Sequence, residues 1–179
     1  MAATLTAIRD DDGKKVGSVA NYLDLRPMRR QQLETRKLAQ AVEQSTASII
    51  ITDTRARIEY VNQAFVRNTG YEPEEVIGRN PSLLHSGNTP PETYRSLWQA
   101  MNERKPWKGE FHNRRRNGEE YIDLATITPL RRPDGTVTHF VAVQEDITEK
   151  KRLGRELDTY RLHLEELVRE RTRELALAR

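Results

Sequence analysis

Cysteine is absent from the 179-residue sequence, and no apolar run approaches the roughly 20 residues that a membrane-spanning helix needs. The lack of thiols excludes disulfides, thiolate metal sites and cysteine nucleophiles, and it suits a reducing compartment. The N-terminus also lacks the apolar segment that begins a secretory signal peptide. We therefore expect a cytoplasmic chain without direct membrane contact.

Patterns that carry catalysis are also absent. The sequence has no phosphate-binding glycine-rich loop, no serine nucleophile motif and no helical histidine pair for a metal. His163, in LHLEEL, lacks the context of a phosphoacceptor histidine. The 30 basic and 27 acidic residues are interspersed, so their balance does not favour a nucleic-acid partner. We expect a non-catalytic chain, with any catalysis of the parent protein in a C-terminal output domain outside this sequence.

An internal repeat is the most informative feature that is present. Residues 4–26 (TLTAIRDDDGKKVGSVANYLDLR) align without a gap to residues 126–148 (TITPLRRPDGTVTHFVAVQEDIT), and the offset is constant at 122 residues. Asp24 thereby falls on Asp146. A period of that length indicates a tandem array of whole domains. We expect residues 1–26 to be the last hairpin of a preceding domain, and the chain to be a fragment of something longer.

Hydrophobic alternation and turn signals predict one domain at residues 48–148. Its element order is two strands, three helices and three strands, which favours an α+β fold with a five-stranded antiparallel sheet and helices on one face. Asn62 is expected to cap the first helix, and Thr89 with Glu92 to form a capping box for the third. The helix-favouring residues 27–47 predict a helical linker before the domain.

Residues 149–179 carry a heptad pattern. Apolar side chains recur at spacings of 4, 3, 4 and 3, at Leu153, Leu157, Tyr160, Leu164 and Leu167. Such a seam predicts a parallel coiled-coil dimer rather than a single solvated helix. The pattern shifts by one residue after Leu164, which indicates a stutter. We expect a homodimer that forms through this coil and through the N-terminal helix.

Three motifs resemble the PAS sensory domain family. They are YVNQAFVRNTGYEPEEVIGRN, WKGEFHNRRRNGEEY and FVAVQEDITEKKR, and they span about residues 45–150. The resemblance implies a PAS fold and a signal-relay role in a bacterial histidine kinase or cyclic-dinucleotide enzyme. It also implies that Asp146, Ile147 and Thr148 form the exit through which a signal reaches the following helix. The opening copy resembles the tail of a preceding PAS domain.

Within that family the sequence most resembles flavin-binding redox sensors of the NifL type. The resemblance implies that Trp98, Asn113 and Gln144 contact a flavin, and FAD is the candidate cofactor. Two amides suit this role, because each offers a donor and an acceptor to the imide edge of the ring. Pro81 stands where light-oxygen-voltage domains carry their photoreactive cysteine, which excludes their covalent light cycle. Haem is not expected, because the four histidines show no helical ligand spacing.

Two functions stay open at this point. One is a ligand-sensing input domain, and the other is a ligand-free dimerisation and relay module. In the second case the core would be filled by Trp98, Phe65 and Leu124. Gln144 would then satisfy buried backbone groups rather than a ligand. In both cases we expect Asp146 to pair with Arg115 or a neighbouring guanidinium and to fix the direction of the outgoing helix.

Overall fold

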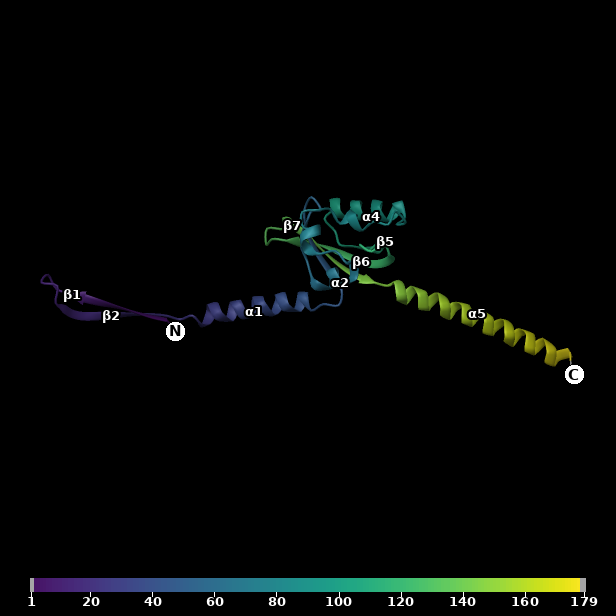
Figure 1. Ribbon diagram of the computed structural model, residues 1–179, viewed down its shortest axis with the longest axis horizontal. Coiled ribbons are helices and arrows are strands. Elements are labelled where there is room, and N and C mark those ends of the chain that lie inside the picture. Colours follow the sequence, from purple (N-terminus) through teal and green to yellow (C-terminus); the bar gives the residue numbers. More distant parts are fainter. Residues whose placement is uncertain (1, 178–179) are drawn as a thin grey trace. The chain divides into compact units, whose positions relative to one another are not determined.

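The computed structural model describes the backbone of residues 2–177, and the side chains of that range except at 2, 3, 21–23 and 175. The chain divides into two compact units, with the boundary between Glu43 and Gln44. The first unit holds a hairpin and a helix, and the second holds an α+β domain with a long helix after it (Figure 1). Among the described residues, no helix is long and apolar enough to cross a membrane.

The first unit consists of β1 (Ala2–Arg9), β2 (Lys15–Leu23) and α1 (Arg26–Glu43). The two strands pair antiparallel and form a two-stranded sheet by themselves. Helix α1 has no buried residue, so its thin apolar stripe is exposed within this unit. Helix α1 occupies most of the range 27–47, where a helical linker was predicted, but it begins one residue earlier and ends four residues earlier than that range.

The hairpin β1–β2 has the same strand register as the last hairpin of the second unit, formed by β6 (Glu120–Arg131) and β7 (Val137–Asp146). Equivalent facing pairs are Thr4–Asn21 and Thr126–Val143. The register irregularity after Ile8 recurs after Leu130. The offset of 122 residues seen in the sequence therefore holds in strand pairing as well as in residue identity.

The ends of the two hairpins are also alike. The backbone N–H of Arg26 donates to the Asp24 carboxylate at 3.0 Å, and the backbone N–H of Thr148 donates to the Asp146 carboxylate at 2.9 Å. A helix begins at Arg26 in the first case and at Thr148 in the second. Each copy of the hairpin thus leads into a helix through an aspartate that binds the first backbone N–H.

The second unit contains a five-stranded antiparallel sheet in the order β4-β3-β7-β6-β5. The additional strands are β3 (Ser48–Asp53), β4 (Ile58–Val61) and β5 (Trp107–Arg114). Inward-facing positions alternate with outward-facing ones, and Ile50, Phe111 and Ala125 are among the buried residues. The sheet and its antiparallel pairing confirm the predicted fold class.

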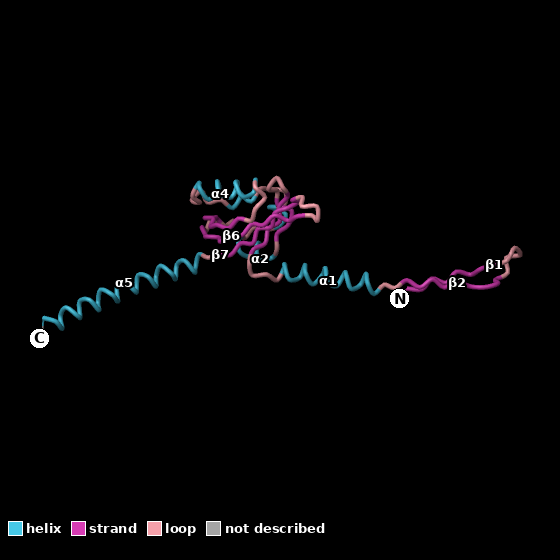
Figure 2. The backbone as a smooth tube through the Cα atoms, turned by 180° about the vertical axis from the view of Figure 1, so that it is seen from behind, coloured by secondary structure: helices cyan, strands magenta, loops and turns pink. Residues whose placement is uncertain are grey.

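The helices between β4 and β5 cover the sheet. They are α2 (Gln63–Thr69), α3 (Pro73–Val76), the short 3-10 helix η1 (Pro81–Leu84) and α4 (Pro91–Asn102). Figure 2 shows the five strands as one layer with α4 lying along it. Asn62 caps α2, because its side chain accepts from the backbone N–H of Phe65, as predicted.

The predicted capping box of α4 is wrong. Pro90 occupies the N-cap position of this helix, and no side chain caps it. The Thr89 hydroxyl accepts from the backbone N–H of His112 at 2.8 Å and lies 3.2 Å from the carbonyl of the same residue, to which it donates. Thr89 therefore fastens the loop before α4 to strand β5. A helix-start pattern in the sequence does not reveal such a competing tertiary partner.

Two apolar clusters form the core. The first surrounds Phe65, which is fully buried, and the second joins β5 to α4 through Trp107 and Phe111, whose ring centroids are 5.1 Å apart. The Trp107 ring N–H donates to the Ser96 hydroxyl of α4 at 3.0 Å. Trp98 is 53% exposed, so the prediction that it fills the core is wrong. Trp107 packs between helix and sheet instead.

The long helix α5 (Thr148–Leu177) follows β7 directly. All five predicted seam residues lie between 42% and 70% exposed in the single chain: Leu153, Leu157, Tyr160, Leu164 and Leu167. A helix that leaves a row of apolar side chains in water gains stability when the row is covered. The helix is confirmed, and its pairing stays a prediction.

Candidate functional site

A cavity of about 250 Å³ lies between the inner face of the sheet and the helices η1 and α4. Its wall is mostly apolar. The helices contribute Pro81, Tyr94, Leu97, Trp98 and Met101, and the strands contribute Ile50, Phe111, Ile127, Phe140 and Ala142. From the sheet side, the amide side chains of Asn113 and Gln144 and the hydroxyl side chain of Thr52 add polar groups to the wall. A concave apolar site with a few polar groups is the usual form of a small-molecule pocket.

All three residues that the sequence placed at a cofactor line this cavity. Trp98 comes from α4, Asn113 from β5 and Gln144 from β7. The alternation predicted for the last strand explains the position of Gln144, because Phe140 and Ala142 line the cavity from the same face. Trp98 and Gln144, 46 positions apart in the sequence, thus line one cavity.

Gln144 carries a buried polar atom without a partner. The side chain is 6% exposed, and its Oε1 makes no hydrogen bond to any residue that the structure describes. An acceptor left in this state costs about 1–3 kcal/mol compared with a bonded one. Buried polar atoms are almost always satisfied in folded proteins, so this oxygen points to a donor supplied from the cavity.

Asn113 connects the cavity to a buried carboxyl group behind it. Its side-chain Nδ2 donates to Asp123 Oδ2 at 3.1 Å, and Asp123 is 3% exposed. Burial raises the pKa of Asp123 to about 6, and the nearby Asp146 charge adds to the rise, while the bond from Asn113 and the charge of Arg115 oppose it. An acid with this pKa changes its charge close to neutral pH.

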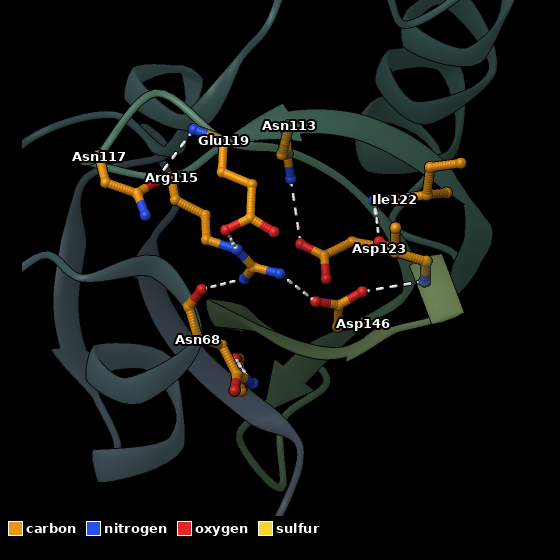
Figure 3. Close-up of polar contacts among 10 residues, drawn as sticks. Asn68, Asn113, Arg115, Asn117, Glu119, Ile122, Asp123 and Asp146 are labelled. Atoms are coloured by element: carbon orange, nitrogen blue, oxygen red, sulfur yellow. Dashed lines mark hydrogen bonds and ion pairs between the residues drawn. The ribbon is translucent and has the colours of Figure 1, made fainter. Parts of the chain in front are cut away.

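Arg115 and Asp146 form a partly buried ion pair at the end of β7, as Figure 3 shows. The Arg115 Nη2 donates to Asp146 Oδ2 at 2.5 Å, and its Nη1 donates to the Asn68 carbonyl. The guanidinium also lies over the Tyr121 ring, 4.2 Å from the ring centroid. The predicted pairing of Asp146 with Arg115 is confirmed.

The electrostatics of Asp146 follow from these contacts. Partial burial by itself would raise its pKa, but bonds from Thr148 and Arg115 outweigh burial, and the pKa lies below the usual value. The second oxygen, Oδ1, accepts the backbone N–H of Thr148 at 2.9 Å. Asp146 therefore stays ionised at neutral pH and caps the first turn of α5 while its other oxygen holds Arg115.

The next two residues bind the helix start to β6. The backbone N–H of Ile147 donates to the Ile122 carbonyl at 2.9 Å, and the backbone N–H of Ile122 donates to the Thr148 hydroxyl at 2.8 Å. Ile147 is buried, with 5% of its surface exposed. One turn later, Lys151 donates to Glu110 of β5 at 2.5 Å. The first turn of α5 is thus fastened to the sheet that lines the cavity.

Comparison with known families matches residues 46–149 to the PAS domain. The chain belongs to the PAS domain family. PAS domains are sensory, non-catalytic modules, and the relatives of this chain are signal-transduction regulators and histidine kinases.

This chain spans only about a quarter of the length of the curated relatives that it matches first. The nitrogen fixation regulatory protein of Klebsiella oxytoca is 39% identical over 127 residues, which are 71% of this chain and 26% of that protein. The light-oxygen-voltage domain of the Erythrobacter litoralis EL346 blue-light activated histidine kinase is 29% identical, with a TM-score of 0.56 over 59% of this chain and 99% of that one. A light-oxygen-voltage domain described with a flavin analogue is 26% identical, with a TM-score of 0.59 over 69% of this chain and 96% of that one.

One residue of the PAS domain site was not predicted as a functional residue. The sequence alone does not show that Asp123 meets both Asn113 and Asp146. A signal was present, because Tyr121, Asp123 and Ala125 alternate on the buried face of β6. A carboxylate at an inward strand position requires a partner or a proton.

His85 also lines the cavity of the PAS domain. Its ring lies 4.7 Å from the Tyr94 ring, centroid to centroid, and burial lowers its pKa. A lowered pKa keeps the imidazole neutral at physiological pH, so His85 adds a polar but uncharged group to the wall.

Proposed function

We propose that this PAS domain senses a small molecule in the cavity and passes its presence to the helix α5 of two paired chains. The single observation that carries the proposal is Gln144, whose side chain lines the cavity and whose buried Oε1 has no donor among the residues that the structure describes. Gln144 is two residues before Asp146, the cap of α5. A ligand that binds Gln144 therefore acts on the strand that leads straight into the outgoing helix.

A flavin is the candidate ligand, because the residues fit its ring. Trp98 and the apolar wall suit the flat apolar body, and Asn113 and Gln144 suit an imide edge with alternating donors and acceptors. When bound, a flavin supplies a ring whose protonation changes with its redox state. The part played by this chain is to hold the polar edge with Gln144, whose amide can rotate to present either its N–H or its oxygen.

A ligand-free relay is the second candidate, and the cavity volume favours it. The volume of about 250 Å³ lies below the roughly 300–1,000 Å³ usual for small-molecule sites. In that case the domain transmits movements of α1 to α5 through the sheet, and the cavity stays empty or holds water. The two candidates differ in whether anything co-purifies with the protein.

The deciding experiment is the visible absorption spectrum of the purified protein, with mass spectrometry of whatever is released on unfolding. We expect the spectrum of an oxidised flavin in the native protein. The Gln144→Leu variant should lose about tenfold or more of the bound molecule, because an apolar side chain cannot bond to the ring. Asn88→Ala is a control, since Asn88 is exposed and binds Glu120 outside the cavity. A colourless protein that releases no small molecule would contradict ligand sensing and favour the ligand-free relay.

We propose that pairing through α5 carries the output. The seam of α5 is exposed in the single chain, and covering it stabilises a coiled coil. Leu157 and Leu162 allow a matched test, because both leucines are exposed, at 70% and 61%, but only Leu157 lies on the seam. Sedimentation should show a dimer for the native chain and Leu162→Lys, and a monomer for Leu157→Lys. Equal behaviour of both variants would contradict pairing through this seam.

We also propose that residues 1–26 are the last hairpin of a second PAS repeat, and that α1 is the outgoing helix of that repeat. The shared register and the shared aspartate cap support this. An isolated two-stranded hairpin is marginally stable in water. Amides of β1–β2 should therefore exchange with solvent much faster than the equivalent amides of β6–β7, which have strands on both sides. Equal protection would mean that β1–β2 is a self-sufficient element.

A further inference from the structure

Asp123 is nearly buried, with 3% of its surface exposed, and it is separated from the cavity by Asn113. It does not line the cavity itself. Any molecule that engages the Asn113 amide therefore competes with the hydrogen bond that Asn113 gives to Asp123. Losing that bond changes the proton affinity of the carboxyl group, because a donor stabilises the ionised form.

Asp123 also faces the cap of the outgoing helix. In the strand register, Asp123 of β6 lies directly opposite Asp146 of β7. Figure 3 shows the two carboxyl groups turned toward each other, with the Arg115 guanidinium bound to Asp146. The other titratable group packed against Asp123 is Tyr121 of its own strand, which burial keeps neutral by raising its pKa. Two carboxylates and one guanidinium thus share a small, mostly buried space.

We propose that Asp123 is a proton-binding site that couples the polar end of the cavity to the aspartate cap of α5. The coupling is a property of the protein without ligand. It rests on the proposed function only for the identity of the molecule that occupies the cavity.

The coupling works through charge. When Asp123 is ionised, it repels Asp146 and attracts Arg115, so the ion pair that holds the cap is weakened. When Asp123 takes a proton from solvent onto its carboxylate, the repulsion disappears, and Asp146 and Glu119 remain as the carboxylate partners of Arg115. A ligand whose acceptor atom draws the Asn113 N–H away raises the proton affinity of Asp123, and the proton then taken up strengthens the cap. Ligand binding in the cavity and the strength of the Asp146 cap of α5 are therefore coupled through protonation of Asp123.

The test is an NMR titration of the unliganded protein that follows the Asp123 carboxyl carbon and the Thr148 backbone amide in the same samples. We expect both signals to move with one midpoint, near pH 6, because Thr148 donates to Asp146 and reports the cap. In Asp123→Asn, which keeps the size of the side chain and removes the proton site, the Thr148 step near pH 6 should vanish. In Asn113→Ser both midpoints should rise together by about one unit, or about tenfold in proton affinity.

Controls separate this proton site from the histidines. His85→Gln removes the imidazole that lines the cavity, and it should leave the Thr148 step in place. A carboxyl signal that titrates near the ordinary value for aspartate would overturn the proposal, and so would a Thr148 step that survives in Asp123→Asn. Because the titration uses protein with nothing bound, its result does not depend on whether a flavin or any other ligand is found. A variant that fails to fold is replaced by Asn113→Ala in the same comparison.

Discussion

Lys151, in the first turn of α5, donates to the Glu110 carboxylate of β5 at 2.5 Å. Glu110 points outward from the sheet, whereas Phe111 and Asn113 on the same strand point into the cavity. Strand β5 therefore contacts the cavity on one face and the outgoing helix on the other. This bond adds to the attachments of α5 to the sheet at Asp146 and at Ile122.

Removing the charge of Glu110 should loosen the first turn of α5 without unfolding the domain. Both partners are about 40% exposed, so we expect Glu110→Gln to lower the free energy of unfolding by less than about 1 kcal/mol. Amides 149–152 should exchange faster. Glu156→Gln is the control, since Glu156 pairs with Arg152 of the same helix. If both variants show the same exchange at the start of α5, the Glu110 bond does not anchor the helix.

The two asparagine caps should differ greatly in their contribution to stability. The fully buried Asn62 accepts from the backbone N–H groups of Ile49 and Phe65 and donates to the Ala47 carbonyl. Asn62→Ala removes three bonds to backbone groups that are buried at Phe65 and half-buried at Ala47 and Ile49, so unfolding by urea should become easier by about 3 kcal/mol. The Asn80 side chain accepts from the backbone N–H of Ser82 and is exposed, so Asn80→Ala should cost about 1 kcal/mol. Similar losses would contradict the bridging role of Asn62.

Replacing Gly109 by any residue with a side chain should destabilise the domain. A Cβ at Gly109 would collide with the ring of Trp107, which packs against Phe111 and binds Ser96. We expect Gly109→Ala to destabilise the domain by about 1–3 kcal/mol, with a change in tryptophan fluorescence as the ring moves. Gly154→Ala is the opposite control, because Gly154 lies in α5 with open space around its Cβ position. That change should stabilise the helix by up to about 1 kcal/mol.

Local patterns predicted most of the fold, and long-range contacts account for what they missed. The strands, the Asn62 cap and the placement of Gln144 on the same strand face as Phe140 and Ala142 follow from alternation and turn chemistry, which act over a few residues. The roles of Trp98 and Trp107 could not be assigned in this way, because which tryptophan is buried depends on how α4 meets β5. Thr89 was misassigned for the same reason, since its partner is 23 residues away.

The residues of the cavity and of its connection to α5 also differ in how far they could be predicted. The resemblance to PAS domains implied that Asn113 and Gln144 contact the same ligand. In the structure both residues line one wall of the cavity. Asp123 needed the exact pairing of β6 with β7, which sets it opposite Asp146. A shift of one residue in that register would turn Asp123 to the outer face, where its pKa would have no reason to rise.

Protonation of Asp123 should make the stability of the domain depend on pH between about 4 and 6. The folded pKa of about 6 lies above the ordinary value of 3.8, so the folded state binds this proton more tightly than the unfolded state. Stability from this group is therefore fully present below pH 3.8 and is lost as the pH rises through about 6. The difference corresponds to about 3 kcal/mol as an upper estimate, since one unit is about 1.4 kcal/mol.

The measurement is urea unfolding of native protein and Asp123→Asn from pH 4.5 to 8. Asp123→Asn has no carboxylate to ionise, so it should exceed the native protein in stability by about 1–3 kcal/mol above pH 7, and the gap should close toward pH 4.5. Asp146 works in the opposite direction, because its pKa is lowered and the stability that it gives is lost only when the pH falls below the ordinary aspartate value. Asp146→Asn should therefore be less stable than the native protein at pH 7. A constant gap between the native protein and Asp123→Asn across this range would show that Asp123 does not titrate there.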